Sequence, residues 1–359
     1  MNDTNAPLYD ARGNRYVVVA PARIDGCPKT AAAAAAAPEW TTHAITACCT
    51  PCSNPEHDAA PNAAGSHEMH LSDGLIVGPF NDAPPYDICI VNTDGTLAER
   101  SGNGLTIFAA ALADRGALAP GQSIDVRVHH RSATTDNPTV TTLTRADTPV
   151  ADDMRAKAVG PAHGIWAEMG RPVFGPSAVN GDPTHLRPAG DRADIFSLRA
   201  LAAIDPAWTR STLVRLGNPH CVTWLPSPDR LPAFDALARA PLEPAARAIA
   251  FAGTTHDAVF PDGINLQWAT VTAADRVAAR IFERGEGPTA SSGTSASAVA
   301  SAARRLGLVT AAVVHVDMPG GTAIIRFTPA ARTDISTAEQ AAEFTVDYFG
   351  TARQVSRRA

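Results

Sequence analysis

The 359-residue chain lacks the features that define several protein classes. Its six cysteines are too sparse for a disulfide scaffold in a chain of this length. No apolar run approaches the roughly 20 residues that span a bilayer. A net charge of −6, without a basic cluster, argues against a nucleic-acid partner. Residues 1–5 lack the basic and apolar regions of a secretory signal, so we expect a cytoplasmic protein that binds no membrane.

Common catalytic and metal-binding motifs are also missing. No G-x-S-x-G sequence occurs, which weakens an α/β-hydrolase hypothesis. The glycine-containing loop at residues 287–294 has no Walker A lysine, and no H-E-x-x-H sequence is present. Cys49 and Cys52 have the CxxC spacing, but no second CxxC or HxxxH ligand pair follows them. We therefore predict no metal and no cofactor, and interpret these cysteines as free thiols of a surface insertion.

Two segments, residues 92–104 and 283–295, follow one plan; their sequences are NTDGTLAERSGNG and ERGEGPTASSGTS. In each, a serine (Ser101 or Ser292) precedes a glycine, and an apolar, alanine-rich segment follows. A glycine turn that opens a helix presents unpaired N–H groups and the positive end of the helix dipole, which bind carboxylates or phosphates. We therefore predict two halves that hold one anionic ligand, with both serines facing it. Considered alone, each serine is a typical N-cap.

The rest of the pattern predicts strands in series with one buried helix in each half. The expected helices, residues 105–113 and 296–306, are apolar nearly all round or rich in alanine. The expected strands are 16–19, 74–77, 87–91, 126–129, 140–143, 165–169, 213–216, 221–224, 266–271, 277–282, 313–316, 322–327 and 344–349. This arrangement is an α+β fold with pseudo-twofold duplication.

We expect two domains, residues 1–152 and 153–342, joined through the polar residues 149–155. A strand near residues 343–355 is expected to return to the first domain. The stretch from about 28 to 70 combines an alanine run with polar residues, and we interpret it as a low-complexity surface insertion.

The chain resembles the diaminopimelate epimerases over most of its length. The motifs that carry the resemblance are residues 13–19, 73–75, 92–104, 217–220, 265, 283–295 and 319–321. The resemblance implies two pseudo-symmetric domains, each a curved mixed sheet wrapped around a central α-helix, an active site in the cleft between them, and a homodimer. It also implies a cofactor-independent isomerase of amino-acid metabolism and lysine biosynthesis. Such an enzyme inverts an α-carbon by proton transfer between two facing cysteines.

Serine occupies both cysteine positions, Ser101 and Ser292. A serine hydroxyl is a much weaker acid than a thiol and needs a neighbouring base. Three hypotheses stay open: an inactive or engineered Cys-to-Ser form, altered chemistry, or a non-catalytic amino-acid-binding protein. The altered chemistry would be that of an isomerase, dehydratase or cyclase with His220 or Glu283 as single general base. His220 is a candidate because its unperturbed pKa lies near neutrality.

The positions that the resemblance assigns to the substrate keep the family's residue types. Asparagines and a Glu-Arg pair would hold the distal end of a small zwitterionic amino acid, and backbone N–H groups at the two helix starts would hold the reacting carboxylate. These residues are Asn14, Asn92, Asn218, Asn265, Glu283 and Arg284, with Gly102, Asn103, Gly293 and Thr294 at the helix starts. Glu99, two residues before Ser101, is expected to be solvated.

Overall fold

The computed structural model describes residues 6–49, 72–98, 100–131, 138–147, 159–190, 192–251, 259–330 and 341–356. It divides into two compact units, Met1–Ile165 with Thr351–Ala359, and Trp166–Gly350. The chain leaves the first unit within strand β7 (His163–Gly170) and returns to it within β18 (Phe344–Val355). The expected crossing at residues 149–155 lies outside the described residues. No described helix is long and apolar enough to cross a membrane.

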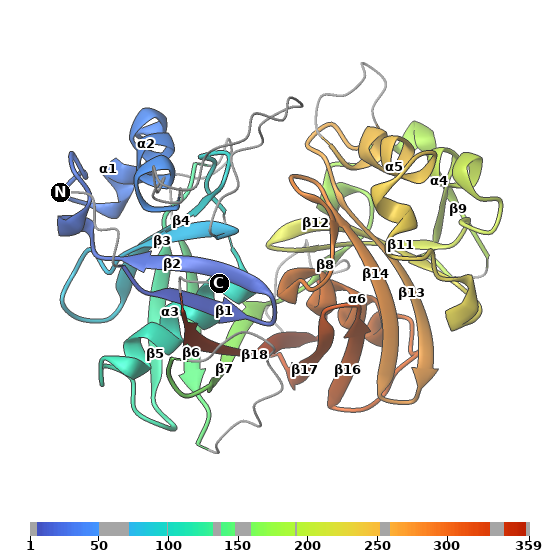
Figure 1. The fold of residues 1–359 in the computed structure, drawn as a ribbon. Helices are drawn as coiled ribbons and strands as arrows, with labels where there is room; N and C mark the ends of the chain where they lie inside the picture. The colour runs from blue at the N-terminus through green and yellow to red at the C-terminus, as the bar shows by residue number, and fades with distance from the viewer. Residues whose placement is uncertain are drawn as a thin grey trace. The chain divides into compact units, whose positions relative to one another are not determined.

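The first unit contains one mixed sheet (Figure 1). Its strands are β1 (Leu8–Ala11), β2 (Asn14–Val19), β3 (Gly74–Val77), β4 (Tyr86–Asn92), β5 (Ser123–Val128) and β6 (Thr139–Arg145). They pair in the order β18–β1–β2–β3–β4–β5–β6. The successive pairs are antiparallel, antiparallel, parallel, antiparallel, parallel and antiparallel.

The second unit repeats this order. Its main strands are β8 (Val173–Phe174), β11 (Ser211–Leu216), β12 (Asn218–Trp224), β13 (Asn265–Ala273), β14 (Arg276–Glu283), β16 (Val313–Met318) and β17 (Gly321–Pro329). They pair as β8–β11–β12–β13–β14–β16–β17, with the same succession of antiparallel and parallel pairs as in the first unit. The duplication inferred from the two serine motifs is thus a duplication of sheet topology.

Shorter elements complete both units. The short strands are β9 (Leu186–Pro188), β10 (Phe196–Leu198) and β15 (Gly287–Thr289), and α4 spans Arg199–Ile204. The 3₁₀ turns are Pro21–Arg23, Ser177–Val179, Pro183–His185, Pro228–Arg230 and Ala236–Ala238.

A single long helix lies inside each unit, α3 (Gly102–Asp114) in the first and α6 (Gly293–Arg305) in the second. Helix α6 contacts β11, β12, β13, β14, β16 and β17, so the sheet surrounds it. Two buried hydroxyls on these helices bond within their own helix: Thr106 donates to the Gly102 carbonyl and Ser297 to the Gly293 carbonyl, each at 2.8 Å. Large apolar side chains on α3, and small ones on α6, fill the space inside the sheet. The predicted α+β fold, a curved sheet around a central helix in each half, is confirmed.

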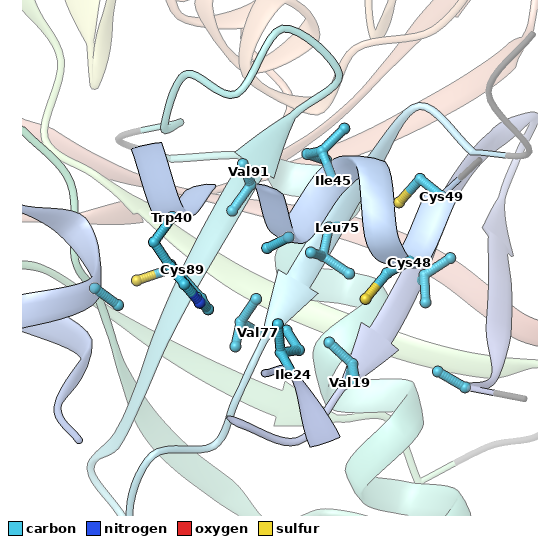
Figure 2. Close-up of a cluster of buried hydrophobic side chains, with 14 of the residues drawn as sticks. Val19, Ile24, Trp40, Ile45, Cys48, Cys49, Leu75, Val77, Cys89 and Val91 are labelled. Atoms are coloured by element: carbon cyan, nitrogen blue, oxygen red, sulfur yellow. The ribbon is translucent and has the colours of Figure 1, made fainter. Parts of the chain in front are cut away.

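The expected surface insertion is wrong for residues 28–49. Strands β2 and β3 are parallel, so the chain must cross over between them, and helices α1 (Ala31–Ala35) and α2 (Pro38–Cys49) belong to this crossover. Figure 2 shows Ile45, Cys48 and Cys49 of α2 beside the β3 side chains. These three residues are at most 2% exposed and belong to one core cluster with Leu75 of β3.

The cysteines Cys48 and Cys49 are therefore buried thiols, not surface thiols. Residues 50–71, which hold Cys52 and the histidines after it, lie outside the described residues. In the second unit, helix α5 (Leu242–Ala250) belongs to the matching crossover between the parallel strands β12 and β13. The alanine run was misinterpreted because composition alone does not show that a parallel strand pair needs a covered crossover.

The remaining expected elements are present. Each expected strand overlaps an observed one, and β1 precedes the strand that we expected to open the fold. Gly217 has a positive φ of 70° in the tight turn between β11 and β12. Strand β12 starts at Asn218, so His220 lies within a strand and not in a loop.

If α2 is part of the core, Ile45→Ala should lower the free energy of unfolding by about 2–4 kcal/mol, because it leaves a cavity under the helix. The exposed neighbour His43 provides the control, and His43→Ala should change stability by less than about 0.5 kcal/mol. Urea unfolding followed by circular dichroism measures both variants. Equal stabilities of the two variants would contradict the packing of α2.

Candidate functional site

The start of α6 places a serine against a carboxylate. Ser292 is the N-cap, and its Oγ accepts the Ser295 N–H at 3.3 Å. The same hydroxyl donates to Glu283 Oε1 at 2.7 Å, and Thr294 Oγ1 lies 3.2 Å from it. Ser292 is therefore both a helix cap and the hydrogen-bond donor to a potential base. Its hydroxyl oxygen faces the positive end of the helix dipole, which stabilises negative charge there.

Glu283 ends strand β14, and hydroxyls surround its carboxylate. Thr289 Oγ1 donates to Oε2 at 3.3 Å, opposite the bond from Ser292 to Oε1. Burial of the carboxyl raises the pKa of Glu283, while the hydroxyl bonds and the Arg284 charge partly oppose that effect. A carboxylate with a raised pKa is a better proton acceptor than an ordinary surface glutamate.

Two glycines allow the backbone to approach closely around Ser292. A Cβ on Gly293 would lie 3.0 Å from atoms of the Tyr348 ring, so only glycine fits there without displacement. A Cβ on Gly320 would lie 2.9 Å from the Ser291 side chain, and the Gly320 N–H donates to the Ala290 carbonyl at 2.7 Å. The turn between β16 and β17 thus supports the loop that leads into α6.

Arg284 and two asparagines form a second cluster at the same edge of the sheet. The Arg284 backbone N–H donates to Asn265 Oδ1 at 2.9 Å. Its guanidinium donates to Asn218 Oδ1 and to the Asp262 carbonyl, each at 3.2 Å. Asn218 and Asn265 begin strands β12 and β13, while Glu283 ends the antiparallel strand β14. Strand order therefore brings these polar side chains together.

His220 is fully buried beneath this edge. The Gln267 amide donates to His220 Nδ1 at 3.0 Å and to Ser295 Oγ at 3.2 Å. The ring proton then lies on Nε2, which has no hydrogen-bond partner among the described residues. Burial, and then the charges of Arg284 and Arg215, lower the pKa of His220 from 6.5 to about 3. A neutral imidazole of this kind is a hydrogen-bond donor and a poor proton acceptor at neutral pH.

The first unit has the same arrangement at the start of α3. Ser101 is the N-cap, and its Oγ accepts the Gly104 N–H at 3.1 Å. Asn14 begins β2 and Asn92 ends β4, so they occupy the positions that Asn218 and Glu283 occupy in the second unit. Within the described part of the first unit, Ser101 has no carboxylate partner. Glu99 lies outside the described residues.

The structure thus joins most of the predicted site residues of the second unit by hydrogen bonds. Those of the first unit share one sheet edge and one helix start, with Gly102 and Asn103 buried in the first turn of α3. Sequence reasoning missed Thr289, Ser295 and Gln267. Glu283 pairs with Gly287 in the β14–β15 hairpin. Side chains two residues apart on a strand share a face, so the hairpin would have predicted Thr289 on the same face as Glu283. No group of three or more metal-ligating side chains occurs among the described residues.

Comparisons with known proteins give the family. The sequence profile described as diaminopimelate epimerase matches residues 212–340. The diaminopimelate epimerase of Burkholderia thailandensis is 30% identical over 252 residues, which cover 70% of this chain and 73% of that one. The chain belongs to the diaminopimelate epimerase family. It is therefore an isomerase of the epimerase and racemase class.

Solved structures share the fold at low sequence identity. A probable proline racemase from Agrobacterium radiobacter K84 matches with a TM-score of 0.55 and 12% identity, covering 97% of this chain and 89% of that one. A methylitaconate-delta-isomerase matches with a TM-score of 0.52 and 12% identity, covering 98% of this chain and 93% of that one. At this identity these structures show a shared fold and nothing about the site.

The environment of His220 predicts an imidazole that stays neutral at physiological pH. In ¹⁵N-histidine NMR spectra we expect one ring whose shifts stay constant from about pH 8 to 5, where a model histidine titrates near 6.5. His220→Gln should remove this signal set. A set that titrates near 6.5 and disappears in His220→Gln would contradict the prediction.

The same lowered pKa makes folding depend on pH. The unfolded chain binds a proton at His220 near pH 6.5 and the folded chain only near 3. The contribution of His220 to stability is therefore fully present above about pH 6.5 and is lost as the pH falls toward 3. His220→Gln should flatten this part of the stability profile in urea titrations.

Proposed function

We propose that the protein is a cofactor-independent amino-acid epimerase or racemase in which Ser292 and Glu283 form one proton-transfer pair. The observation that carries the proposal is the 2.7 Å hydrogen bond from Ser292 Oγ to Glu283 Oε1 at the start of α6. A base within hydrogen-bond distance is what a serine hydroxyl needs for proton transfer. The burial that raises the pKa of Glu283 favours this role further.

The proposed step moves two protons in concert. Ser292 Oγ accepts the proton from the substrate α-carbon while its own hydroxyl proton passes to Glu283 Oε1. The electron pair of the C–H bond stays on the substrate as a carbanion conjugated with its carboxylate. The N–H groups of the first turn of α6 and the helix dipole stabilise the negative charge that develops there.

Inversion also needs a proton donor on the other face of the α-carbon. By the family resemblance this donor is Ser101, which caps α3 as Ser292 caps α6. Ser101 gives its hydroxyl proton to the carbanion; a solvent water then reprotonates Ser101, and Glu283 releases the proton it gained to solvent, which restores both groups for the next turnover. The described part of its own unit gives Ser101 no carboxylate, so we propose that the two serines differ in how readily each transfers its proton.

The proposed substrate is a small zwitterionic amino acid. Arg284 would bind a distal carboxylate through its guanidinium, which Asn218 and the Asp262 carbonyl already orient. Among amino acids we expect diaminopimelate to fit best, because the chain keeps the Glu-Arg pair and the asparagines of the family. A homodimer and a cytoplasmic location are proposed from the same resemblance.

A second candidate is an isomerase, dehydratase or cyclase that uses a single general base. The observation that favours it is an asymmetry between the two serines. Ser292 donates to the carboxylate of Glu283, whereas no described carboxylate of the first unit bonds to Ser101. One base removes a proton, and the product then forms without inversion of the α-carbon. His220 is a weaker candidate than Glu283 for this base because its pKa is lowered to about 3. The remaining alternative, a binding protein without turnover, predicts ligand affinity with no proton exchange.

The first test is α-proton exchange in D₂O with a panel of amino acids that includes diaminopimelate. We expect deuterium at the α-carbon together with inversion, because the removed proton is not returned to the same face. Exchange or product formation without inversion would support the single-base candidate instead. If calorimetry detects binding of an amino acid and no amino acid exchanges its α-proton, the remaining hypothesis is a binding protein without turnover.

Glu283→Gln should lower the exchange rate at least about 100-fold, because the amide cannot accept the serine proton. The control is Ser301→Ala, which removes a buried hydroxyl from the same helix two turns away from the site. It should leave the exchange rate within about twofold of the unchanged protein. Similar rates for Glu283→Gln and Ser301→Ala would refute the Ser292–Glu283 pair.

Cysteine at both serine positions should raise activity. A thiol ionises far more readily than a hydroxyl, and a helix N-terminus lowers its pKa further. We expect each of Ser101→Cys and Ser292→Cys to increase epimerisation, and the double variant to increase it by at least about tenfold. No gain in the double variant would show that the pocket serves another reaction. Rates are measured by polarimetry or chiral chromatography at fixed pH.

A further inference from the structure

A cavity of about 570 Å³ lies at the other end of α6 from the serine site. The walls contain Leu306 and Leu308, which follow the last turn of the helix, and Trp224 and Leu225 from the end of β12. Helix α6 has 13 residues, so the cavity and Ser292 are separated by roughly 20 Å along the helix. The cavity therefore belongs to neither the proposed proton-transfer pair nor the cluster around Arg284.

The walls of the cavity are apolar and firmly held. Trp224 is buried, and its indole N–H donates to Thr212 Oγ1 at 3.1 Å. The backbone N–H of Leu225 donates to the Ala269 carbonyl at 2.9 Å. Ile195 and Leu306 are also buried and line the same hollow. A preformed apolar cavity of this size is typical of sites for small organic ligands.

Two arginines provide the charge at the cavity. Arg192 donates to the Leu306 carbonyl at the C-terminal end of α6. Arg210 is exposed, and its guanidinium has no hydrogen bond or ion pair among the described residues. Asp194, an acid near Arg192 in sequence, is bound by Arg305 at 2.9 Å. Among the described residues that line the cavity, the only charged ones are these two arginines.

We propose that this cavity binds a small amphipathic carboxylate, with the carboxylate on Arg210 and the apolar body against Trp224 and the leucines. A guanidinium without a partner beside apolar walls complements a molecule with one anionic end and one apolar end. An amino acid does not fit equally well, because none of the described lining residues is an acid that could accept its ammonium group. The ligand is thus of a different class from the proposed substrate.

The test uses octanoate as the probe and isothermal titration calorimetry on the full chain. Octan-1-ol is the uncharged comparison, and 2-aminooctanoate adds the ammonium group. We expect octanoate to bind at least tenfold more tightly than either, because octan-1-ol lacks the carboxylate and 2-aminooctanoate carries an ammonium group that no described lining residue accepts. Equal binding of octanoate and octan-1-ol would overturn the role of Arg210, and no octanoate binding up to millimolar concentration would overturn the site.

Variants localise the binding. Arg210→Gln should weaken octanoate binding at least tenfold, whereas Arg187→Gln, which alters an arginine of a different hollow, should not change it. Equal losses in both would mean non-specific attraction and would refute the site. Ser292→Ala should leave octanoate binding unchanged whether or not the proposed epimerase activity exists. Loss of octanoate binding in Ser292→Ala would place the probe at the serine site and overturn the separate cavity.

Discussion

A helix that is buried on every side can present only its ends to a ligand, and this constraint organises the second unit. Helix α6 is enclosed by six strands, so only its two ends are left to meet a ligand. The N-terminal end carries Ser292 and the carboxylate of Glu283. The C-terminal end is neutralised by Arg192 and borders the apolar cavity. The positive N-terminal end of the helix dipole thus has an acidic neighbour, and the negative C-terminal end has a basic one.

The duplicated fold carries different side chains at equivalent positions of its two halves. Asn92 and Glu283 end equivalent strands, β4 and β14, just before the two capping serines. The amide of Asn92 binds the Thr96 hydroxyl at 3.0 Å, whereas the carboxylate of Glu283 accepts the proton of Ser292. One topological position therefore holds a neutral group in the first unit and an acid in the second. This difference is the physical basis on which we propose unequal roles for the two serines.

The sequence predicted the features that depend on local pattern. The two serine motifs predicted α3 and α6, and alternating or continuous apolar residues predicted strands such as β4 and β14. The sequence analysis failed where contacts between distant segments decide whether a side chain is buried. Trp40 and Ile45 are buried because β2 and β3 are parallel and need a covered crossover, which composition cannot show. The sequence made His220 a candidate base with a pKa near neutrality, but strand β12 buries it, beside Gln267, which is distant in sequence.

Serine at position 292 changes which atom of the site carries the charge. A thiolate there would lie beside the Glu283 carboxylate, and two neighbouring anions raise one another's pKa. A serine hydroxyl stays neutral and donates its proton, so Glu283 becomes the group that titrates in this half of the site. The burial that raises its pKa brings the carboxyl closer to neutral pH, where proton transfer is most effective. In the proposed mechanism the hydroxyl relays the proton, the carboxylate is the base, and the helix dipole stabilises the oxygen between them.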